Sequence, residues 1–142
     1  MKKDKIRIAV VGLGFGAEFV PIYLEHPDVE SVTICDANTE RLQSVAERFA
    51  IKKKLSDMGE VIQSEEIDAV HLISGIPEHA EQTLAVLKSG KHCACTVPMA
   101  TSIVLNDTRH GIYFQEDSVI IKGVIQWELN EMTIESTIDN IQ

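Results

Sequence analysis

Three closely spaced glycines and one distant aspartate are the residues of this chain best suited to bind a phosphorylated ligand. Residues 12–17 read Gly-Leu-Gly-Phe-Gly-Ala and directly follow an apolar run that ends at Val11. A second apolar run, Val32 to Cys35, ends in Asp36. This pattern is typical of a dinucleotide-binding βαβ unit, in which a strand leads through a tight glycine turn into a helix and an acid follows about 20 residues further on. The competing interpretation is a chance glycine-rich loop, and the position of the motif between a strand and a helix argues against it.

Each position of the glycine turn has a physical role in this prediction. Gly12 permits a sharp turn out of the strand, and Gly14 has no side chain to hold a pyrophosphate away from backbone amides at the helix start. Phe15 and Gly16 belong to the same turn and are predicted to contact the cofactor. The small Ala17 is expected to let the first helix lie close to the sheet.

Asp36 predicts which dinucleotide the chain binds. Its carboxylate can accept hydrogen bonds from both ribose hydroxyls of an adenosine, whereas the same charge repels a 2′-phosphate. NAD is therefore favoured over NADP. Arg41 lies one helical turn further on and could pair with such a phosphate, but the chain has no arginine next to Asp36 in sequence.

Strands and helices are expected to alternate as far as residue 100. Apolar runs predict strands over 6–11, 32–35, 54–55, 69–73 and 92–95, and helical spacing predicts helices over 15–25, 39–49, 57–63 and 77–89. Repeated βα units imply an α/β fold, namely a doubly wound parallel sheet of the Rossmann type. Ligands bind such sheets at the carboxyl ends of the strands, so four further residues are predicted to contact the cofactor: Ser74, Ile76, His79 and Thr96.

Composition excludes several other functions. The net charge of −9 argues against a nucleic-acid partner, because phosphate backbones need clustered Lys and Arg. No apolar run approaches the ~20 residues that span a membrane, and the first strand does not resemble a signal peptide, so a cytoplasmic protein is expected. The three cysteines lack the spacing of a zinc site, and no metal is predicted.

The chain resembles the N-terminal domain of the glucose-fructose oxidoreductase and inositol dehydrogenase family, Gfo/Idh/MocA. The segments that carry the resemblance are Val10–Ala17, Cys35–Asn38, Ile67–Val70, Pro77–His79, Ala85–His92 and Pro98–Ala100. This resemblance implies a nicotinamide dinucleotide and a carbohydrate-like or polyol substrate. It also implies a second domain that supplies much of the substrate site and the oligomer interface.

Two departures from the family pattern leave the catalytic residues unknown. The family usually has Glu-Lys-Pro where this chain has Thr96-Val97-Pro98, and a valine can neither carry charge nor donate a hydrogen bond. The paired Asp and His of the family's second domain have no counterpart. His79 is the general-base candidate nearest the expected nicotinamide, with cofactor contact and a purely structural position as the alternatives.

The resemblance stops near residue 101, which divides the chain into two predicted regions. Residues 1–101 are the expected Rossmann domain, and residues 102–142 are an acidic tail. Apolar residues between Val119 and Trp127 favour a sixth strand, and Glu128 to Gln142 is expected to be frayed. A shift of reading frame near codon 102 and a genuine short protein are both open explanations.

Three hypotheses for function follow. The first is the NAD-binding domain of a Gfo/Idh/MocA-like oxidoreductase, which needs its second domain to act on a small-molecule substrate. The second is a stand-alone NAD-binding or redox-sensing module that acts through a partner, and the third is a non-functional fragment. Sheet surface left uncovered by the missing domain would favour self-association, which makes a homo-oligomer an expectation.

Overall fold

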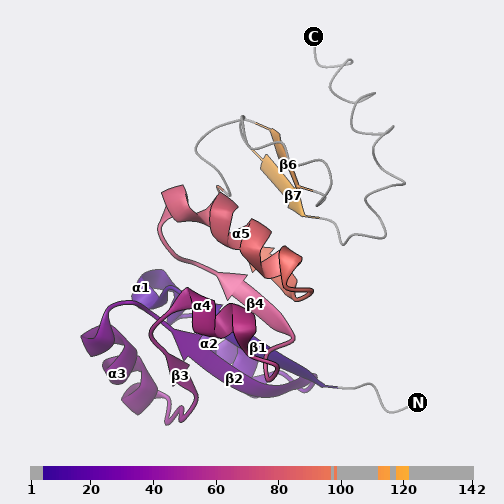
Figure 1. The fold of residues 1–142 in the computed structure, drawn as a ribbon. Helices are drawn as coiled ribbons and strands as arrows, with labels where there is room; N and C mark the ends of the chain where they lie inside the picture. The colour runs from indigo at the N-terminus through magenta and orange to yellow at the C-terminus, as the bar shows by residue number, and fades with distance from the viewer. Residues whose placement is uncertain (1–4, 97, 99–111, 116–117, 122–142) are drawn as a thin grey trace.

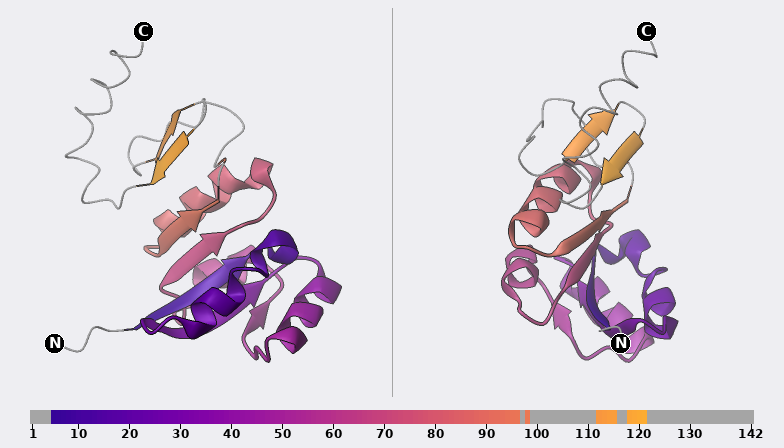
Figure 2. Two further views of the ribbon diagram at one scale, coloured as in Figure 1. Left: turned by 180° about the vertical axis from the view of Figure 1, so that it is seen from behind. Right: turned by 90° about the vertical axis from the view of Figure 1, so that its right-hand side faces the viewer.

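The computed structural model describes residues 5–96, residue 98, residues 112–115 and residues 118–121 (Figure 1). Five parallel strands form one sheet in the order β3-β2-β1-β4-β5. Their bounds are β1 Ile6–Val11, β2 Val29–Cys35, β3 Lys54–Leu55, β4 Ala69–Leu72 and β5 His92–Cys95. Helices cover both faces of this sheet (Figure 2), so the predicted doubly wound fold is confirmed.

The helices between these strands begin and end close to the predicted positions. They are α3 Thr39–Arg48, α4 Met58–Gln63 and α5 His79–Lys88, the last preceded by the short 3₁₀ helix η1 Ile76–Glu78. Asn38 caps α3, because its side chain accepts a 2.9 Å hydrogen bond from the Arg41 amide. Asp57 caps α4 in the same way through the Gly59 amide, at 2.7 Å. Among the described residues, no helix is both long and apolar enough to cross a bilayer.

The helix predicted over 15–25 is in fact two short helices, which corrects that prediction. They are α1 Leu13–Gly16 and α2 Val20–Glu25. Pro21 stands in the first turn of α2. Proline has no amide hydrogen to continue a helical ladder, yet its fixed φ suits the start of a new helix. The chain therefore turns tightly between the two helices, with the Phe19 amide bonded to the Gly16 carbonyl at 3.0 Å.

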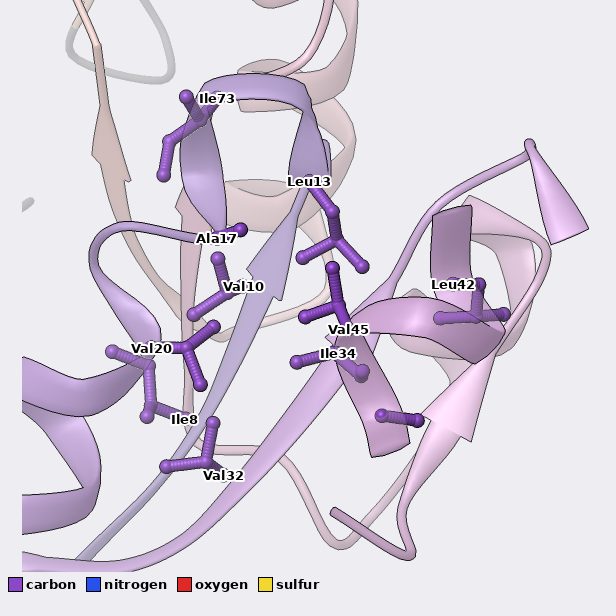
Figure 3. Packing of buried hydrophobic residues seen from close by; sticks show 11 residues of the cluster. Ile8, Val10, Leu13, Ala17, Val20, Val32, Ile34, Leu42, Val45 and Ile73 are labelled. Atoms are coloured by element: carbon purple, nitrogen blue, oxygen red, sulfur yellow. The ribbon is translucent and has the colours of Figure 1, made fainter. Parts of the chain in front are cut away.

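Alternate residues of the central strand face two separate apolar cores. Ile8 and Val10 of β1 pack with α1, α2 and α3, and part of this first core is drawn in Figure 3. Ala9 and Val11 face the other way and pack into a second core. Because both faces of the strand are covered, its sequence is a continuous apolar run rather than an alternating one.

Within the described residues, the sixth strand expected between Val119 and Trp127 does not join the parallel sheet. β7, Ser118–Ile121, pairs antiparallel with β6, Ile112–Gln115, in a separate two-stranded sheet. Only two residues separate these strands, and so short a connection permits antiparallel pairing alone. The expected frayed segment, Glu128 to Gln142, and the departure at Val97 lie outside the described residues.

An ion pair at the start of β1 gives a first testable prediction. The Arg7 guanidinium and amide bond the Asp68 carboxylate at 2.7 to 2.9 Å, and these bonds lower the pKa of Asp68 to about 2. A depressed carboxyl pKa stabilises the fold above the unfolded value near ~4, and this stabilisation is lost as the pH falls toward 2. We therefore expect the melting temperature of wild type to fall more steeply between pH 4 and 2 than that of Asp68→Asn.

The matched control for this experiment is Glu66→Gln. Glu66 pairs with Lys53 at 3.0 Å, but its side chain is 70% exposed, and exposed pairs contribute little. Thermal unfolding monitored by circular dichroism between pH 4 and 2 gives the melting temperatures of wild type, Asp68→Asn and Glu66→Gln. Parallel curves for wild type and Asp68→Asn would show that the Arg7 pair does not couple folding to pH.

Candidate functional site

A cleft of about 460 Å³ opens where strands β1, β2 and β4 end. The chain builds β2 and β3 on one side of β1 and then crosses to β4 on the other, so the cleft lies where the strand order reverses. It contains four of the predicted site residues, which are Gly12, Gly14, Asp36 and Ser74. The other lining residues are Val11, Cys35, Ala37, Arg41, Ser56, Asp57, Met58, Ile73, Gly75, Glu78 and Gln82.

Gly12 makes the turn at the end of β1, as predicted, and the structure shows how tight that turn is. Its φ is +89°, and a Cβ atom on this residue would lie 2.5 Å from the backbone of Ile73 and Ser74. The backbone atoms of Ile73 and Ser74 cannot shift enough to make room for a side chain on Gly12. The close approach of β1 to the end of β4 therefore requires glycine here.

Gly16 brings α1 close to side chains of the first core. A Cβ on Gly16 would lie 3.2 Å from the Ile73 side chain and 3.3 Å from that of Val10. Ala17 is also buried, in the first core beside these residues (Figure 3). Gly16 and Ala17 are thus both small, buried residues where the chain lies close to the first core.

Gly14 faces open space inside the cleft. A Cβ on this residue would have one neighbour, Nη1 of Arg41, at 4.0 Å. Nothing in the described part of the protein therefore requires glycine for packing at this position. The space beside Gly14 is open to a bound group, and a side chain at this position would fill it.

Asp36 is buried at the end of β2 and already holds several hydrogen bonds. One carboxylate oxygen accepts the Leu13 amide and the other the Asn38 amide, each at 2.8 Å. The side chain is 7% exposed, and Nη1 of Arg41 lies 3.1 Å from Oδ2. Arg41 is thus beside Asp36, a contact that adjacency in sequence did not reveal. The five-residue spacing into a helix capped at Asn38 is the signal that would have found it.

A short chain of polar side chains lines the opposite wall of the cleft. The Ser74 hydroxyl donates to Oε1 of Gln82, and the Gln82 amide group lies 3.5 Å from a Glu78 oxygen. Sequence reasoning missed Glu78 and Gln82. Their spacing of four residues, immediately after the Ser74 strand end, places both on one helical face and is the signal that could have found them.

His79 does not line the cleft. Its ring is 2% exposed, with Nε2 2.8 Å from the Ser74 carbonyl and Nδ1 2.9 Å from the Pro98 carbonyl. Both ring nitrogens are therefore engaged with the backbone, which is the structural alternative considered for this residue. The contacts join the loop after β4 to Pro98, which follows β5. As a cofactor contact, His79 stays a prediction.

The remaining predicted cofactor contacts lie outside the lining of the cleft. Phe15 is 63% exposed with its ring edge-on to Phe19, and Ile76 is 43% exposed. The Thr96 hydroxyl donates to the Leu72 carbonyl at 3.0 Å. These three residues, together with Gly16 and Ala17, stay predictions as ligand contacts.

Electrostatics make the cleft thiol a poor nucleophile. Burial, and to a smaller extent the negative charges of Asp36, Asp57 and Glu60, raise the pKa of Cys35 to about 12. A thiol is reactive as its thiolate, which this environment disfavours. Of the described residues that line the cleft, Arg41 alone carries a positive charge. The arrangement suits polar recognition of a ligand better than covalent chemistry by the protein.

Residues 6–109 match the model of an oxidoreductase family described as having an NAD-binding Rossmann fold, and this match covers most of the chain. The chain belongs to the Gfo/Idh/MocA family. It is 33% identical over 98 residues to a 4-carboxy-2-hydroxymuconate-6-semialdehyde dehydrogenase from Sphingobium, covering 68% of this chain and 31% of that protein. It is 29% identical over 102 residues to the myo-inositol 2-dehydrogenase of Thermotoga maritima, covering 69% and 30%.

The fold of this Gfo/Idh/MocA chain also matches solved structures. One is the WlbA dehydrogenase from Bordetella pertussis in complex with NADH and UDP-GlcNAcA, with a TM-score of 0.63 and 30% identity. The match covers 69% of this chain and 30% of that one. The chain thus spans about a third of the length of its relatives and corresponds to their NAD-binding Rossmann fold.

Proposed function

We propose that this chain binds NAD in the cleft between β1, β2 and β4 as the cofactor-binding part of an oxidoreductase. The observation that carries the proposal is the pairing of an open position at Gly14 with a buried carboxylate at Asp36. In a Rossmann fold, the first of these admits a pyrophosphate and the second binds an adenosine ribose. The residues present therefore fit a dinucleotide.

Asp36 supports NAD as the preferred dinucleotide. Its two oxygens are held in place by the Leu13 and Asn38 amides, so the carboxylate is already oriented before a ribose arrives. A buried carboxylate accepts hydrogen bonds from vicinal hydroxyls and repels a 2′-phosphate. Asp57 adds a second negative charge to the same cleft.

The substrate class we propose is a small hydroxylated molecule such as a polyol or sugar derivative. Several relatives carry names of that kind, among them a myo-inositol 2-dehydrogenase, a D-glucoside 3-dehydrogenase and a D-apiose dehydrogenase. NAD supplies hydride acceptance when bound, and a protein contributes binding and orientation. The described residues of this chain bind and orient the cofactor, whereas residues beyond the matched third of the relatives would orient the substrate.

Replacing Gly14 with valine tests the cofactor assignment. The valine side chain would project into open space, so the fold is expected to keep its stability within about 1 kcal/mol. It would also fill the space that a pyrophosphate needs. We expect isothermal titration calorimetry with NAD to give saturable binding for wild type and a loss of at least about tenfold in affinity for Gly14→Val.

Ser44→Val is the matched control, because Ser44 is exposed on the neighbouring helix α3 and does not line the cleft. It adds the same side chain outside the proposed site and should leave NAD binding unchanged. The proposed function fails if wild type shows no saturable binding, or if Gly14→Val binds NAD as tightly as the control.

A further inference from the structure

Two cysteines lie on one face of strand β5. Side chains alternate between the faces of a strand, so Cys93 and Cys95, two residues apart, are on the same side. The register agrees, because they lie beside Val70 and Leu72 of β4, which belong to the second core. Both cysteines are half-buried against that core, and neither lines the cleft. The pair is therefore a separate set of sulfur ligands that is partly open to solvent.

A buried hydroxyl lies near this pair. Thr83 is fully buried on α5, the helix that packs against β5 (Figure 2). Its Oγ1 makes no well-formed hydrogen bond within the described part of the chain. Burial raises the pKa of both thiols, that of Cys93 to about 12, whereas the Thr83 hydroxyl lowers the pKa of each. The hydroxyl is thus close to both sulfurs and lacks a good acceptor.

A thiolate would supply the acceptor that Thr83 lacks. A thiol sulfur is a weak hydrogen-bond acceptor, and hydrogen bonds to a charged acceptor are stronger. A free thiolate is disfavoured at this half-buried position, because burial penalises the charged form. A bound cation removes this obstacle, since a thiol that coordinates a metal is deprotonated outright. The unpaired hydroxyl therefore suits a metal-bound form of the pair.

The ligands favour a soft ion that two sulfurs can hold. Thiolates select Cu(I) among the biological metals, whereas structural zinc needs four ligands. Among the described residues, no group of three His, Cys, Asp or Glu side chains could hold a metal. Cα atoms two residues apart in a strand are about 6.6 Å from each other. Rotation of each side chain about χ1 can bring the two sulfurs toward one ion.

We propose that Cys93 and Cys95 bind one Cu(I) ion between their sulfurs, with the Thr83 hydroxyl donating a hydrogen bond to a coordinated sulfur. On binding, two Cu–S bonds form and two S–H bonds break, both protons pass to solvent, and the copper stays Cu(I). The Cys95 thiol gives up its 3.5 Å hydrogen bond to the Thr96 carbonyl, which is weak because sulfur is a poor donor. This site is independent of the function proposed above.

Competition with bicinchoninate for Cu(I), with the full chain kept reduced under nitrogen, tests the proposal. The chain should withdraw one Cu(I) per molecule from the coloured bicinchoninate complex, and a sulfur-to-copper charge-transfer band should appear in the ultraviolet. Loss of a partner outside the metal's own ligands weakens binding about tenfold or more. Loss of a ligand should cost more, so we expect Cys93→Ala and Cys95→Ala each to weaken Cu(I) binding at least about a hundredfold.

Cys35→Ala is the matched control, because it removes the third thiol, which lies in the same core at the end of β2. It should bind Cu(I) as tightly as wild type, with circular dichroism confirming that each variant is folded. The proposal is overturned if wild type withdraws no Cu(I), or if all three variants lose affinity equally. Binding of one Cu(I) per two chains would also overturn it, since the ion would then bridge separate molecules.

Thr83→Val tests the part assigned to the hydroxyl. Valine has nearly the same shape, and removing an unpaired buried hydroxyl should leave the fold as stable as wild type or more stable. The coordinated sulfur would lose its hydrogen bond, so we expect Cu(I) affinity to fall about tenfold. A Thr83 that only fills the core would leave this affinity unchanged, and that result would overturn the proposed arrangement.

Discussion

Replacing Gly12 with alanine should cost this domain about 2 to 5 kcal/mol of unfolding free energy, combining overpacking with a left-handed backbone. The Cβ would lie 2.5 Å from the backbone of Ile73 and Ser74, where strand β4 ends beside the turn. The added methyl would therefore push β1 and β4 apart at the point where the cleft opens. Domains of this size have an unfolding free energy of about 5 to 15 kcal/mol, so this loss is a large share of the total. Urea denaturation followed by circular dichroism measures the loss.

Gly90 provides the matched control for this prediction. Its φ of +82° is close to the +89° of Gly12, yet nothing lies within 4 Å of a Cβ built on it. Gly90→Ala thus carries the backbone strain without the collision, and about 1 to 2 kcal/mol is expected. The difference between the two variants measures the collision alone. Equal losses would contradict the claim that the approach of β1 to β4 demands glycine.

Replacing His79 with alanine should also destabilise the fold strongly, by about 2 to 4 kcal/mol. The ring is 2% exposed, and its removal leaves a cavity. It also removes the two ring nitrogens that lie 2.8 and 2.9 Å from the carbonyls of Ser74 and Pro98. Equilibrium denaturation provides the measurement. The predicted consequence is looser attachment of the loop after β4, which forms one wall of the cleft.

Two further variants separate these contributions. His79→Gln fills part of the space and can bond one carbonyl through its amide, so it should lose less stability than His79→Ala. His92→Ala removes an exposed histidine from the start of β5 and should change stability by less than about 0.5 kcal/mol. If His79→Ala proves as stable as His92→Ala, the two carbonyl contacts contribute nothing to the fold.

The sheet and the position of the cleft can be predicted from the sequence. Continuous apolar runs marked the parallel strands, and the observed order, β3-β2-β1-β4-β5, agrees with the doubly wound fold inferred from their alternation with helices. The turn at Gly12 and the acid at Asp36 were both identified before the structure. These features depend on short-range patterns, because a strand, a turn and a helix cap are each specified within a few residues.

Which side chains meet depends on the packing of the folded chain. Arg41 pairs with Asp36 because the cap of α3 directs its first turn toward the end of β2. His79 is buried between two strand-end segments, and a side chain on Gly16 would press against Ile73 and Val10. Such contacts join residues on different elements, so they depend on how the elements pack. The position of the cleft can therefore be predicted from the sequence, whereas the contacts among its side chains depend on how the elements pack.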